Sequence, residues 1–284
     1  MDDPPDRIGI IAGNGTYPFV FARAARAAGV EFLAAAAFTG ETDPALEDEV
    51  DRLQWLRVGQ LGKLIKFFKA AGVAHAAMTG QIAPNNLFDL RPDLRTLVLL
   101  GKLKRRNAES IFGAIGDELA GEGIELLPAT TFLDDLLPGP GHVCGPKPGK
   151  RAHADAEFGF GIAKEVSRMD IGQTVVVKKG TVLAVEAFEG TNAAVTRGGE
   201  LGKGGATMVK VSKPAQDFRF DVPVVGPETV RAAAEAGISL IVVEAGRTLL
   251  LERDAIEELC GKHGISLVAV GEQEGKPTVK ISSG

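Results

Sequence analysis

Short apolar runs separated by glycine turns and helical stretches set the pattern of the first part of the chain. The segment RIGIIAGNGTYPFVFARAARAAGVEFLAAAAF predicts a buried strand at residues 7–12, a glycine turn, a helix ending near Gly29, and a second buried strand at residues 31–38. The segment GQLGKLIKFFKAAG predicts a helix with one apolar face, followed by the strand-like VAHAAM and the turn TGQI. Strands that alternate with helices indicate a parallel sheet covered on both faces.

The pattern continues with shorter elements and then breaks. A helix fits residues 107–122, IELL is a short strand, and ATTFLDDLL is typical of a further helical segment. The stretch PGPGHVCGPKPGKR holds eight Pro and Gly residues in fourteen, which argues against any regular element. We therefore expect an N-terminal Rossmann-like domain over residues 1–137, a linker over 138–152 and a C-terminal domain over 153–284.

The C-terminal part mixes hairpins with crossover connections. A helix is expected around residues 155–168, and QTVVVKKGTVLAVEAF predicts two strands joined as a hairpin across Lys179-Gly180. GGELGKGGATMVKVSKP is expected to be a glycine-rich loop running into a strand, and GPETVRAAAEAG a helix. The fold class predicted for the chain is therefore two-domain α/β, with an N-terminal Rossmann-like parallel sheet and a C-terminal mixed α/β domain.

Composition limits the class of protein and its partners. The 284 residues are 45% apolar, enough for two cores, and the formal charge of −5 comes from mixed charges without a basic stripe, so nucleic acid is not an expected partner. Cys144 and Cys260 match no metal spacing, and the acidic N-terminus does not resemble a signal peptide. No apolar run reaches the roughly 20 residues of a membrane span. We expect a cytoplasmic protein, soluble or at most peripheral to a membrane.

Two turns of the N-terminal part are candidate ligand sites. Gly13, Asn14 and Gly15 lie between a strand and a helix, where backbone N–H groups and the helix dipole favour an anion. The dinucleotide fingerprint is incomplete because Pro18 stands where it needs glycine, which disfavours a dehydrogenase. Thr79 and Gly80 follow a strand that should neighbour the first, so they could face this turn. A tight turn without a ligand remains the alternative for each segment.

The densest polar cluster follows a predicted strand between Lys210 and Val230. Its charged and amide members are Lys210, Lys213, Gln216, Asp217, Arg219 and Asp221. Cations of this kind hold phosphate oxygens, and a carboxylate holds a divalent metal or orients water. Asp221 is surrounded by apolar neighbours, as expected for a carboxylate set into a structured wall. A solvated loop is the alternative from this segment alone.

The stretch VEAFEGTN places Glu186, Glu189, Thr191 and Asn192 just beyond an apolar run. Mg²⁺ takes oxygen ligands and usually needs one or two carboxylates plus substrate phosphates, so the set is chemically sufficient. Its spacing does not separate a metal site from a polar turn that closes a strand. Zinc has little support because the four histidines are scattered, and His75 is expected to lie in the core. Serine-hydrolase and P-loop patterns are absent from the sequence.

Read in order, six segments resemble the LpxI family. They are IGIIAGNGTYP, MTGQI, DELAGEGIELLPATTFLDDLL, MDIGQTVVVKKGTVLAVEAFEGTN, MVKVSKPAQDFRFDVPVVGPETV and AGISLIVVEAGRTLLLER. The resemblance extends from about Arg7 to Val270, and the run DIGQ-VVVK-G-VLAVEA-EGT is long enough to be specific. Members of this family are UDP-2,3-diacylglucosamine pyrophosphatases of lipid A biosynthesis.

The resemblance implies a two-domain, Mg²⁺-dependent hydrolase whose modules clasp a lipid-bearing sugar nucleotide. Its diphosphate would be cleaved to UMP and 2,3-diacylglucosamine 1-phosphate, lipid X. The essential aspartate of the family's R-x-D-[LV]-P motif falls on Asp221, which would ligate the metal or orient water, with Glu186 and Asn192 as further metal ligands. The expected substrate and phosphate contacts are Gly13, Asn14, Gly15, Thr79, Gly80, Glu189, Thr191, Lys210, Lys213 and Gln216.

Two departures from the family pattern keep alternatives open. Asn192 stands where the family usually has Asp after EGT, and Asn107-Ala108-Glu109 stands where most members show GDD. The alternatives are a pyrophosphatase of another sugar nucleotide, or a nucleotide- or lipid-binding homologue without turnover. A membrane-anchored substrate also implies transient association with the inner membrane, and a homodimer is left open.

Overall fold

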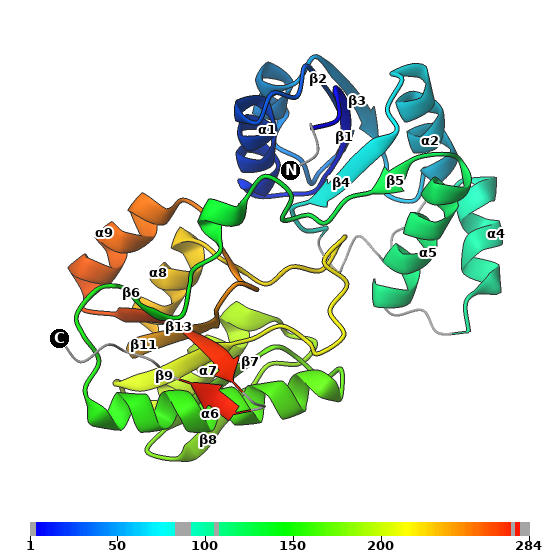
Figure 1. Ribbon diagram of the computed structural model, residues 1–284. Coiled ribbons are helices and arrows are strands. Elements are labelled where there is room, and N and C mark those ends of the chain that lie inside the picture. Colours follow the sequence, from blue (N-terminus) through cyan, green and yellow to red (C-terminus); the bar gives the residue numbers. More distant parts are fainter. Residues whose placement is uncertain (1–3, 83–91, 105–107, 274–275, 279–284) are drawn as a thin grey trace. The chain divides into compact units, whose positions relative to one another are not determined.

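The computed structural model describes residues 4–82, 92–104, 108–273 and 276–278, and the chain divides into two compact units. Unit 1 comprises Met1–Leu133 and Asp217–Asp221, whereas unit 2 comprises Asp134–Gln216 and Val222–Gly284. Each unit combines a β-sheet with helices (Figure 1). The predicted α/β fold class, with a parallel sheet in the N-terminal part and a mixed sheet in the C-terminal part, is confirmed.

Unit 1 is built on a sheet of five parallel strands in the order β3-β2-β1-β4-β5. The strands are β1 (Arg7–Ala12), β2 (Phe32–Phe38), β3 (Arg52–Leu56), β4 (His75–Thr79) and β5 (Glu125–Leu126). The strand order reverses between β1 and β4. In open parallel sheets such a reversal, at the carboxyl ends of the strands, is where ligands bind.

Helices cover both faces of the unit 1 sheet. They are α1 (Tyr17–Ala27), α2 (Leu61–Ala70), α4 (Leu94–Lys102) and α5 (Ala108–Gly121), with a 3₁₀ turn η1 (Pro44–Glu49). Figure 1 shows α1 and α2 on opposite sides of the sheet. Strand side chains alternate between faces, so Ile11 joins the cluster around α2 that includes Phe68. Gly9 is required there because a Cβ on it would lie 2.8 Å from the Phe68 ring.

Unit 2 is built on a mixed sheet in the order β14-β13-β11-β9-β7-β8, with β6 paired to β13. The strands are β6 (Gly141–Cys144), β7 (Thr174–Lys178), β8 (Thr181–Val185), β9 (Ala206–Lys210), β11 (Ile238–Glu244), β13 (Ser266–Gln273) and β14 (Lys276–Thr278). A separate parallel pair joins β10 (Val224–Val225) to β12 (Leu249–Leu250). Strands β9, β11 and β13 are parallel, while β6, β7 and β8 pair antiparallel with their neighbours.

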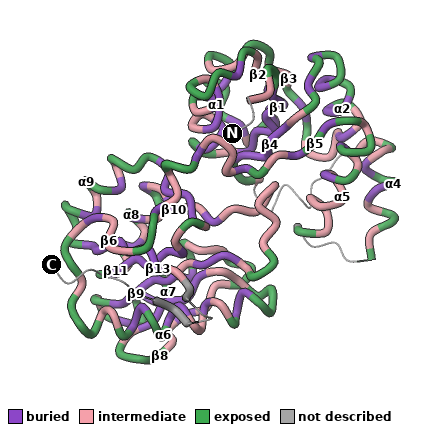
Figure 2. Tube along the Cα trace, in the orientation of Figure 1, coloured by how far each residue is buried: buried purple, intermediate pink, exposed green. Residues whose placement is uncertain are grey.

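Two sets of helices bury the two faces of this second sheet. They are α6 (Lys150–Arg168) on one face and α7 (Thr191–Gly202), α8 (Pro227–Glu235) and α9 (Arg253–His263) on the other. Alternation along β7 divides its side chains, because Val175 and Val177 join the cluster of α6 and Val176 joins that of α7. Figure 2 shows the resulting buried strands beneath helices with exposed outer faces. The free thiols of Cys144 and Cys260 are buried in this core.

The predicted hairpin across Lys179-Gly180 is confirmed. Both residues have positive φ, 50° and 70°, as the tightest two-residue hairpin turns require. Asp155 of α6 fixes this turn, because its carboxylate oxygens accept hydrogen bonds from the backbone N–H groups of Lys179 and Gly180, each at 2.8 Å.

Three local predictions are wrong. ATTFLDDLL forms only the 3₁₀ turn η2 (Asp134–Leu136), because Phe132 takes the left-handed conformation at φ 67° and interrupts a helix. The Pro- and Gly-rich stretch holds β6 and the start of α6, because its glycines and prolines flank a short strand-forming segment. His75 is not in the core, since it begins β4, its side chain is 35% exposed and its Nε2 lies 3.9 Å from the Glu125 carboxylate.

The predicted glycine-rich loop before β9 is confirmed only for residues 203–205, whereas residues 198–202 form the C-terminal end of α7. Packing explains the difference, because a Cβ on Gly198 would lie 2.5 Å from the side chain of Val176 and one on Gly199 would lie 2.1 Å from the carbonyl oxygen of Ala236. The glycines let this helix approach β7 and α8 closely, and that contact overrides their low helix propensity. Strand β3 and helix α4 are two elements that the sequence pattern did not identify.

Candidate active site

The Gly13 turn and the Thr79-Gly80 turn face each other at the reversal between β1 and β4, as predicted. The backbone N–H of Gly13 donates to the carbonyl of Thr79 at 2.7 Å, and that of Asn14 donates to the carbonyl of Gln81 at 2.8 Å. Glycine is required on both sides: a Cβ on Gly13 would lie 2.6 Å from the Gln81 carbonyl oxygen, and one on Gly80 would lie 2.5 Å from that of Asn14.

The polar side chains of these two turns differ in whether they already form hydrogen bonds within the protein. The Asn14 amide donates to Glu41 at 2.9 Å, so it is held in place by a neighbouring loop. The Thr79 hydroxyl is buried and has no hydrogen-bond partner within the described parts of the chain. Gly15 has φ +82°, with open space where a Cβ would stand. A buried hydroxyl without a partner is uncommon in folded proteins, and its position at the strand end favours a ligand contact.

In unit 2, the stretch VEAFEGTN is the connection from β8 to the N-terminus of α7. Gly190 precedes the helix with φ 83°, and no side chain of the described residues caps the helix. The first backbone N–H groups of a helix have no intrahelical partner and, with the helix dipole, attract anions. Thr191 and Asn192 are the first two residues of the helix, so both lie at its positive end.

Thr191, Glu186 and Lys210 come together at this end of α7. The Thr191 hydroxyl donates to Glu186 Oε1 at 2.8 Å and accepts from Lys210 Nζ at 3.2 Å. It also lies 3.4 Å from the hydroxyl of Thr174, a buried residue at the start of β7. A lysine and two hydroxyls at a helix N-terminus form an anion-binding arrangement.

The two glutamates of this stretch have structural contacts. Glu186 accepts the Thr191 hydroxyl with one oxygen and the backbone N–H of Gln173, at 3.3 Å, with the other. Glu189 accepts the N–H of Ala187 at 3.1 Å and a guanidinium N–H of Arg197 at 2.7 Å. These bonds lower the pKa of Glu189, with the backbone hydrogen bonds and Arg197 as causes. Glu189 thus ties the turn to the helix that follows it.

A second polar network, which the sequence did not reveal, lies at the carboxyl ends of β9 and β11. Glu244 ends β11 and is buried; its Oε2 accepts from the N–H of Ser212 at 2.7 Å and from the Ser212 hydroxyl at 2.8 Å. Its Oε1 accepts from Lys164 Nζ at 3.0 Å and lies 3.5 Å from Arg247 Nε. Arg247 Nε also donates to the Ser212 hydroxyl at 2.5 Å. One signal in the sequence could have indicated this network, namely the carboxylate of Glu244 at the end of the apolar strand SLIVVE.

Lys213 and Gln216, both predicted phosphate contacts, shape the loop after β9. The Gln216 side-chain oxygen accepts from the backbone N–H of Lys213 at 2.6 Å, and the Gln216 N–H donates to the Lys213 carbonyl at 3.2 Å. Lys213 Nζ pairs with Asp170. Gln216 therefore closes a turn, while Lys213 and Arg247 bring two cations to the carboxyl ends of adjacent parallel strands.

Asp221 lies in Asp217–Asp221, the segment that belongs to unit 1. The carbonyl of Phe218 accepts from the N–H of Ala129 at 2.7 Å, and the Phe220 ring packs on Phe112 of α5 with centroids 5.8 Å apart. The Arg219 guanidinium forks onto both oxygens of Asp217, at 3.0 and 2.7 Å. These hydrogen bonds hold the pKa of Asp217 below its ordinary value. The N–H of Asp221 donates to the Asp217 carbonyl at 3.0 Å, which fixes the turn that presents the Asp221 carboxylate.

The predicted metal ligands are divided between the units, with Asp221 in unit 1 and Glu186 and Asn192 in unit 2. Over the described ranges, no three His, Cys, Asp or Glu side chains are grouped so as to hold a metal ion. Glu109 lies in the exposed first turn of α5, while Asn107 is outside the described residues. The helices described here include none long and apolar enough to cross a membrane.

Fold and sites together define an α/β protein of two units, with hydroxyl and cationic side chains at the N-terminus of α7 and at strand ends. Family models identify it further. The model described as the LpxI N-terminal domain matches residues 7–136, and that described as the LpxI C-terminal domain matches residues 139–268. The protein named UDP-2,3-diacylglucosamine pyrophosphatase LpxI from Caulobacter vibrioides is 33% identical over 281 residues, covering 94% of this chain and 99% of its own. The chain therefore belongs to the LpxI family.

Proposed function

We propose that this protein hydrolyses the diphosphate of UDP-2,3-diacylglucosamine to UMP and 2,3-diacylglucosamine 1-phosphate in lipid A biosynthesis. The relative's name supplies the reaction class and the substrate. The observation that carries the proposal on this chain is the meeting of Thr191 and Lys210 at the uncapped N-terminus of α7, which suits phosphate oxygens.

Several residues of unit 2 would each contribute to binding the substrate's phosphates. Lys210 neutralises charge and the first N–H groups of α7 donate hydrogen bonds, while the Thr191 hydroxyl, which donates to Glu186 and accepts from Lys210, positions the lysine. Lys213 and Arg247 are further cations for phosphate oxygens, with Arg247 positioned by Ser212 and Glu244. Groups held in place before the reaction stabilise charge that develops in the transition state without reorganisation.

Mg²⁺ is proposed as the cofactor, and Asp221 as its protein ligand. A bound Mg²⁺ would neutralise the diphosphate and lower the pKa of a coordinated water. The donor type fits, because a carboxylate supplies the oxygen ligand that Mg²⁺ prefers, and this ion is usually held by one or two carboxylates plus substrate phosphates. The backbone N–H of Asp221 donates to the carbonyl of Asp217, and this hydrogen bond fixes the backbone from which the Asp221 carboxylate extends.

Asn192 fits a phosphate contact better than a metal ligand. It stands in the first turn of α7, where the helix dipole disfavours a cation and favours an anion. Its amide can donate to a phosphate oxygen, which the Asp usual in the family cannot do. The two alternatives, another sugar-nucleotide substrate and a binder without turnover, make different predictions for purified protein.

A substrate panel separates these alternatives. With Mg²⁺, UMP release from UDP-2,3-diacylglucosamine is expected to exceed release from UDP-N-acetylglucosamine by at least about 10²-fold in kcat/KM, because binding energy from the acyl chains is used in the transition state. EDTA should stop the reaction and added Mg²⁺ restore it. Equal rates on the unacylated nucleotide would favour the other substrate class, and tight binding without UMP release would favour the binder.

Replacing Thr191 tests the phosphate site. Thr191→Val removes the hydroxyl but keeps the shape, so Lys210 loses an acceptor that positions it. Because a hydrogen bond to a charged group contributes about 1.5–3 kcal/mol, kcat/KM is expected to fall about 10- to 100-fold. Thr196→Val is the matched control, because its hydroxyl donates only to the Asn192 carbonyl at 3.0 Å within the same helix. Unchanged kinetics for Thr191→Val, or an equal loss in both variants, would remove Thr191 from the site.

Its place in the cell and its assembly are part of the same proposal. The protein is proposed to act in the cytoplasm, with transient association to the inner membrane where its substrate resides. Nucleic acid has no place in this scheme, because the charges of the chain are mixed and sum to −5. A homodimer remains a prediction from sequence that size measurements in solution would decide.

A further inference from the structure

Helix α4 exposes three large apolar side chains on its outer side, while Leu99 on its inner side is buried in the core. Leu94, Leu97 and Val98 are 78%, 53% and 52% exposed, while Thr96 is buried. Positions i, i+3 and i+4 share one side of a helix, so these three side chains form one outer face. A helix on a globular protein ordinarily buries such a face. We call Leu94, Leu97 and Val98 the outer face of α4.

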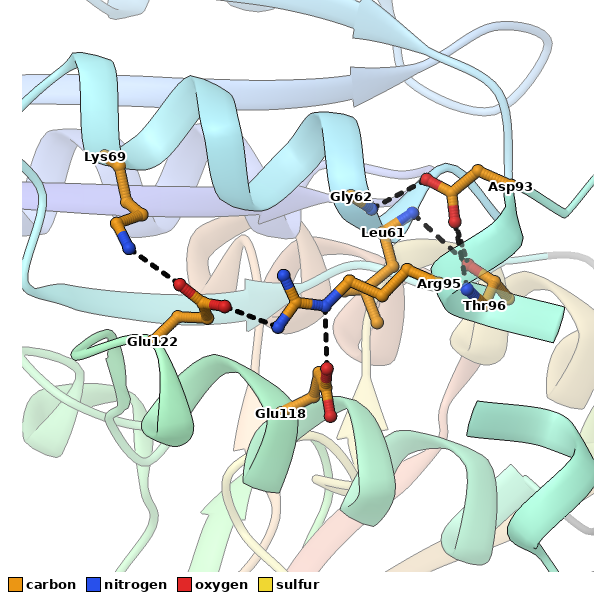
Figure 3. Close-up of polar contacts among 8 residues, drawn as sticks. All are labelled: Leu61, Gly62, Lys69, Asp93, Arg95, Thr96, Glu118 and Glu122. Atoms are coloured by element: carbon orange, nitrogen blue, oxygen red, sulfur yellow. Dashed lines mark hydrogen bonds and ion pairs between the residues drawn. The ribbon is translucent and has the colours of Figure 1, made fainter. Parts of the chain in front are cut away.

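A polar network on the other side of α4 sets this orientation (Figure 3). Asp93 accepts from the N–H of Thr96 at 2.9 Å and from the N–H of Gly62 at 2.7 Å, so one carboxylate caps the starts of both α4 and α2. The Thr96 hydroxyl lies against the start of α2, where it accepts from the N–H of Leu61 at 3.4 Å. Hydrogen bonds from Thr96 and Gly62 outweigh burial and lower the pKa of Asp93.

Arg95 fastens the same helix to α5. Its guanidinium donates to Glu118 at 2.7 Å and to Glu122 at 2.6 Å, and Lys69 of α2 completes the chain by binding Glu122 at 2.6 Å (Figure 3). Hydrogen bonds from Lys69 and Arg95 lower the pKa of Glu122 to about 2. Because the polar side of α4 is held by two helices, the helix cannot turn its outer face inward without breaking these bonds.

Two exposed lysines and a hollow lie next to the outer face of α4. Helix α4 contains no carboxylate, and Lys102 and Lys104 at its C-terminal end are exposed. Beside the face lies a hollow of about 570 Å³ between α4 and α5, walled by apolar residues of α4 such as Val98 and, on the α5 side, by Asp117 and Glu118. An apolar face with cations at its edge is the pattern of helices that lie in a membrane interface.

We propose that the outer face of α4 docks the protein on an anionic lipid bilayer, with Leu94, Leu97 and Val98 at the acyl boundary and Lys102 and Lys104 on phosphate headgroups. The choice of a bilayer as the partner rests in part on the proposed function, whose substrate carries two acyl chains. Cations near an anionic surface attract it within a Debye length, so the binding is sensitive to salt.

Vesicle cosedimentation of the full chain tests the surface. Wild-type protein should sediment with vesicles of phosphatidylethanolamine and phosphatidylglycerol, more weakly at high salt and more weakly with phosphatidylcholine alone. Leu94→Glu with Leu97→Glu should weaken binding at least about tenfold; both side chains are exposed, so the fold should persist, as circular dichroism checks. Leu201→Glu on α7, with a residue 60% exposed, is the matched control and should bind as wild type.

Outcomes for docking and for catalysis remain distinguishable. The double variant should hydrolyse substrate dispersed in detergent at the wild-type rate and lose rate only on substrate in vesicles. If the double variant loses vesicle binding but the wild-type protein releases no UMP, the docking surface is supported and the proposed function is rejected. Equal vesicle binding by wild type and double variant would overturn the docking surface, as would a change from dimer to monomer in sedimentation velocity without any change in vesicle binding.

Discussion

Replacement of Asp221 by Asn should lower kcat for UMP release by about 10³-fold or more, with little change in stability. The substitution keeps the side chain's volume and removes the negative charge that is proposed to hold Mg²⁺, and loss of one electrostatic contact to a transition state commonly costs this much. The turn that presents the residue depends on backbone bonds and on the Arg219–Asp217 pair, which the variant leaves intact. Steady-state kinetics at saturating Mg²⁺, beside thermal unfolding, measure both quantities.

Two comparisons sharpen this result. Asp135→Asn changes an exposed carboxylate outside the site and should retain full activity. If Asp221 ligates the metal, the variant's residual activity should also require more Mg²⁺ for half-saturation than wild type. A fully active, folded Asp221→Asn would reject the assignment of this residue.

Replacement of Glu244 by Gln should lower the free energy of unfolding by about 3 kcal/mol, because removal of one partner from a buried ion pair leaves the others uncompensated. The Glu244 side chain is 6% exposed and that of Lys164 is 16% exposed, so water relieves the remaining lysine charge only in part. Ser212 would also lose the charged acceptor of two hydrogen bonds. Urea unfolding monitored by circular dichroism measures the effect.

The matched control for this network is Glu165→Gln on the same helix as Lys164. Glu165 and its partner Arg168 are each 64% exposed, and surface pairs of this kind contribute about 0–1 kcal/mol. The control should therefore unfold close to wild type. If Glu244→Gln unfolds at the same urea concentration as the control, the network does not stabilise unit 2.

The sequence predicted those elements whose local pattern and tertiary environment agree. The buried strand at β1 and the hairpin turn at Lys179-Gly180 follow directly from apolar runs and turn residues. Prediction from sequence failed where contacts between distant residues determine the local structure. Gly198 lies in a helix that packs closely against Val176, and no local sequence pattern encodes this contact. Helix α4 was missed because its apolar residues lie on both its outer and its buried side, so no single apolar stripe marks it.

The candidate site was predicted unevenly for the same reason. The facing of the Gly13 and Thr79 turns followed from parallel strand order, and Thr191 with Lys210 were named from residue chemistry. The role of Glu244 depends on Ser212, Lys164 and Arg247, which are far apart in the sequence. Asp217–Asp221 belongs by its contacts to unit 1, although in sequence it lies within the C-terminal part.

The most direct test of the central claim is product identification from a single reaction. Purified wild-type protein, incubated with UDP-2,3-diacylglucosamine and Mg²⁺, should yield UMP and 2,3-diacylglucosamine 1-phosphate in equal amounts by mass spectrometry, and neither product when EDTA is present. Folded protein that binds this substrate but releases no UMP at any Mg²⁺ concentration would contradict the account.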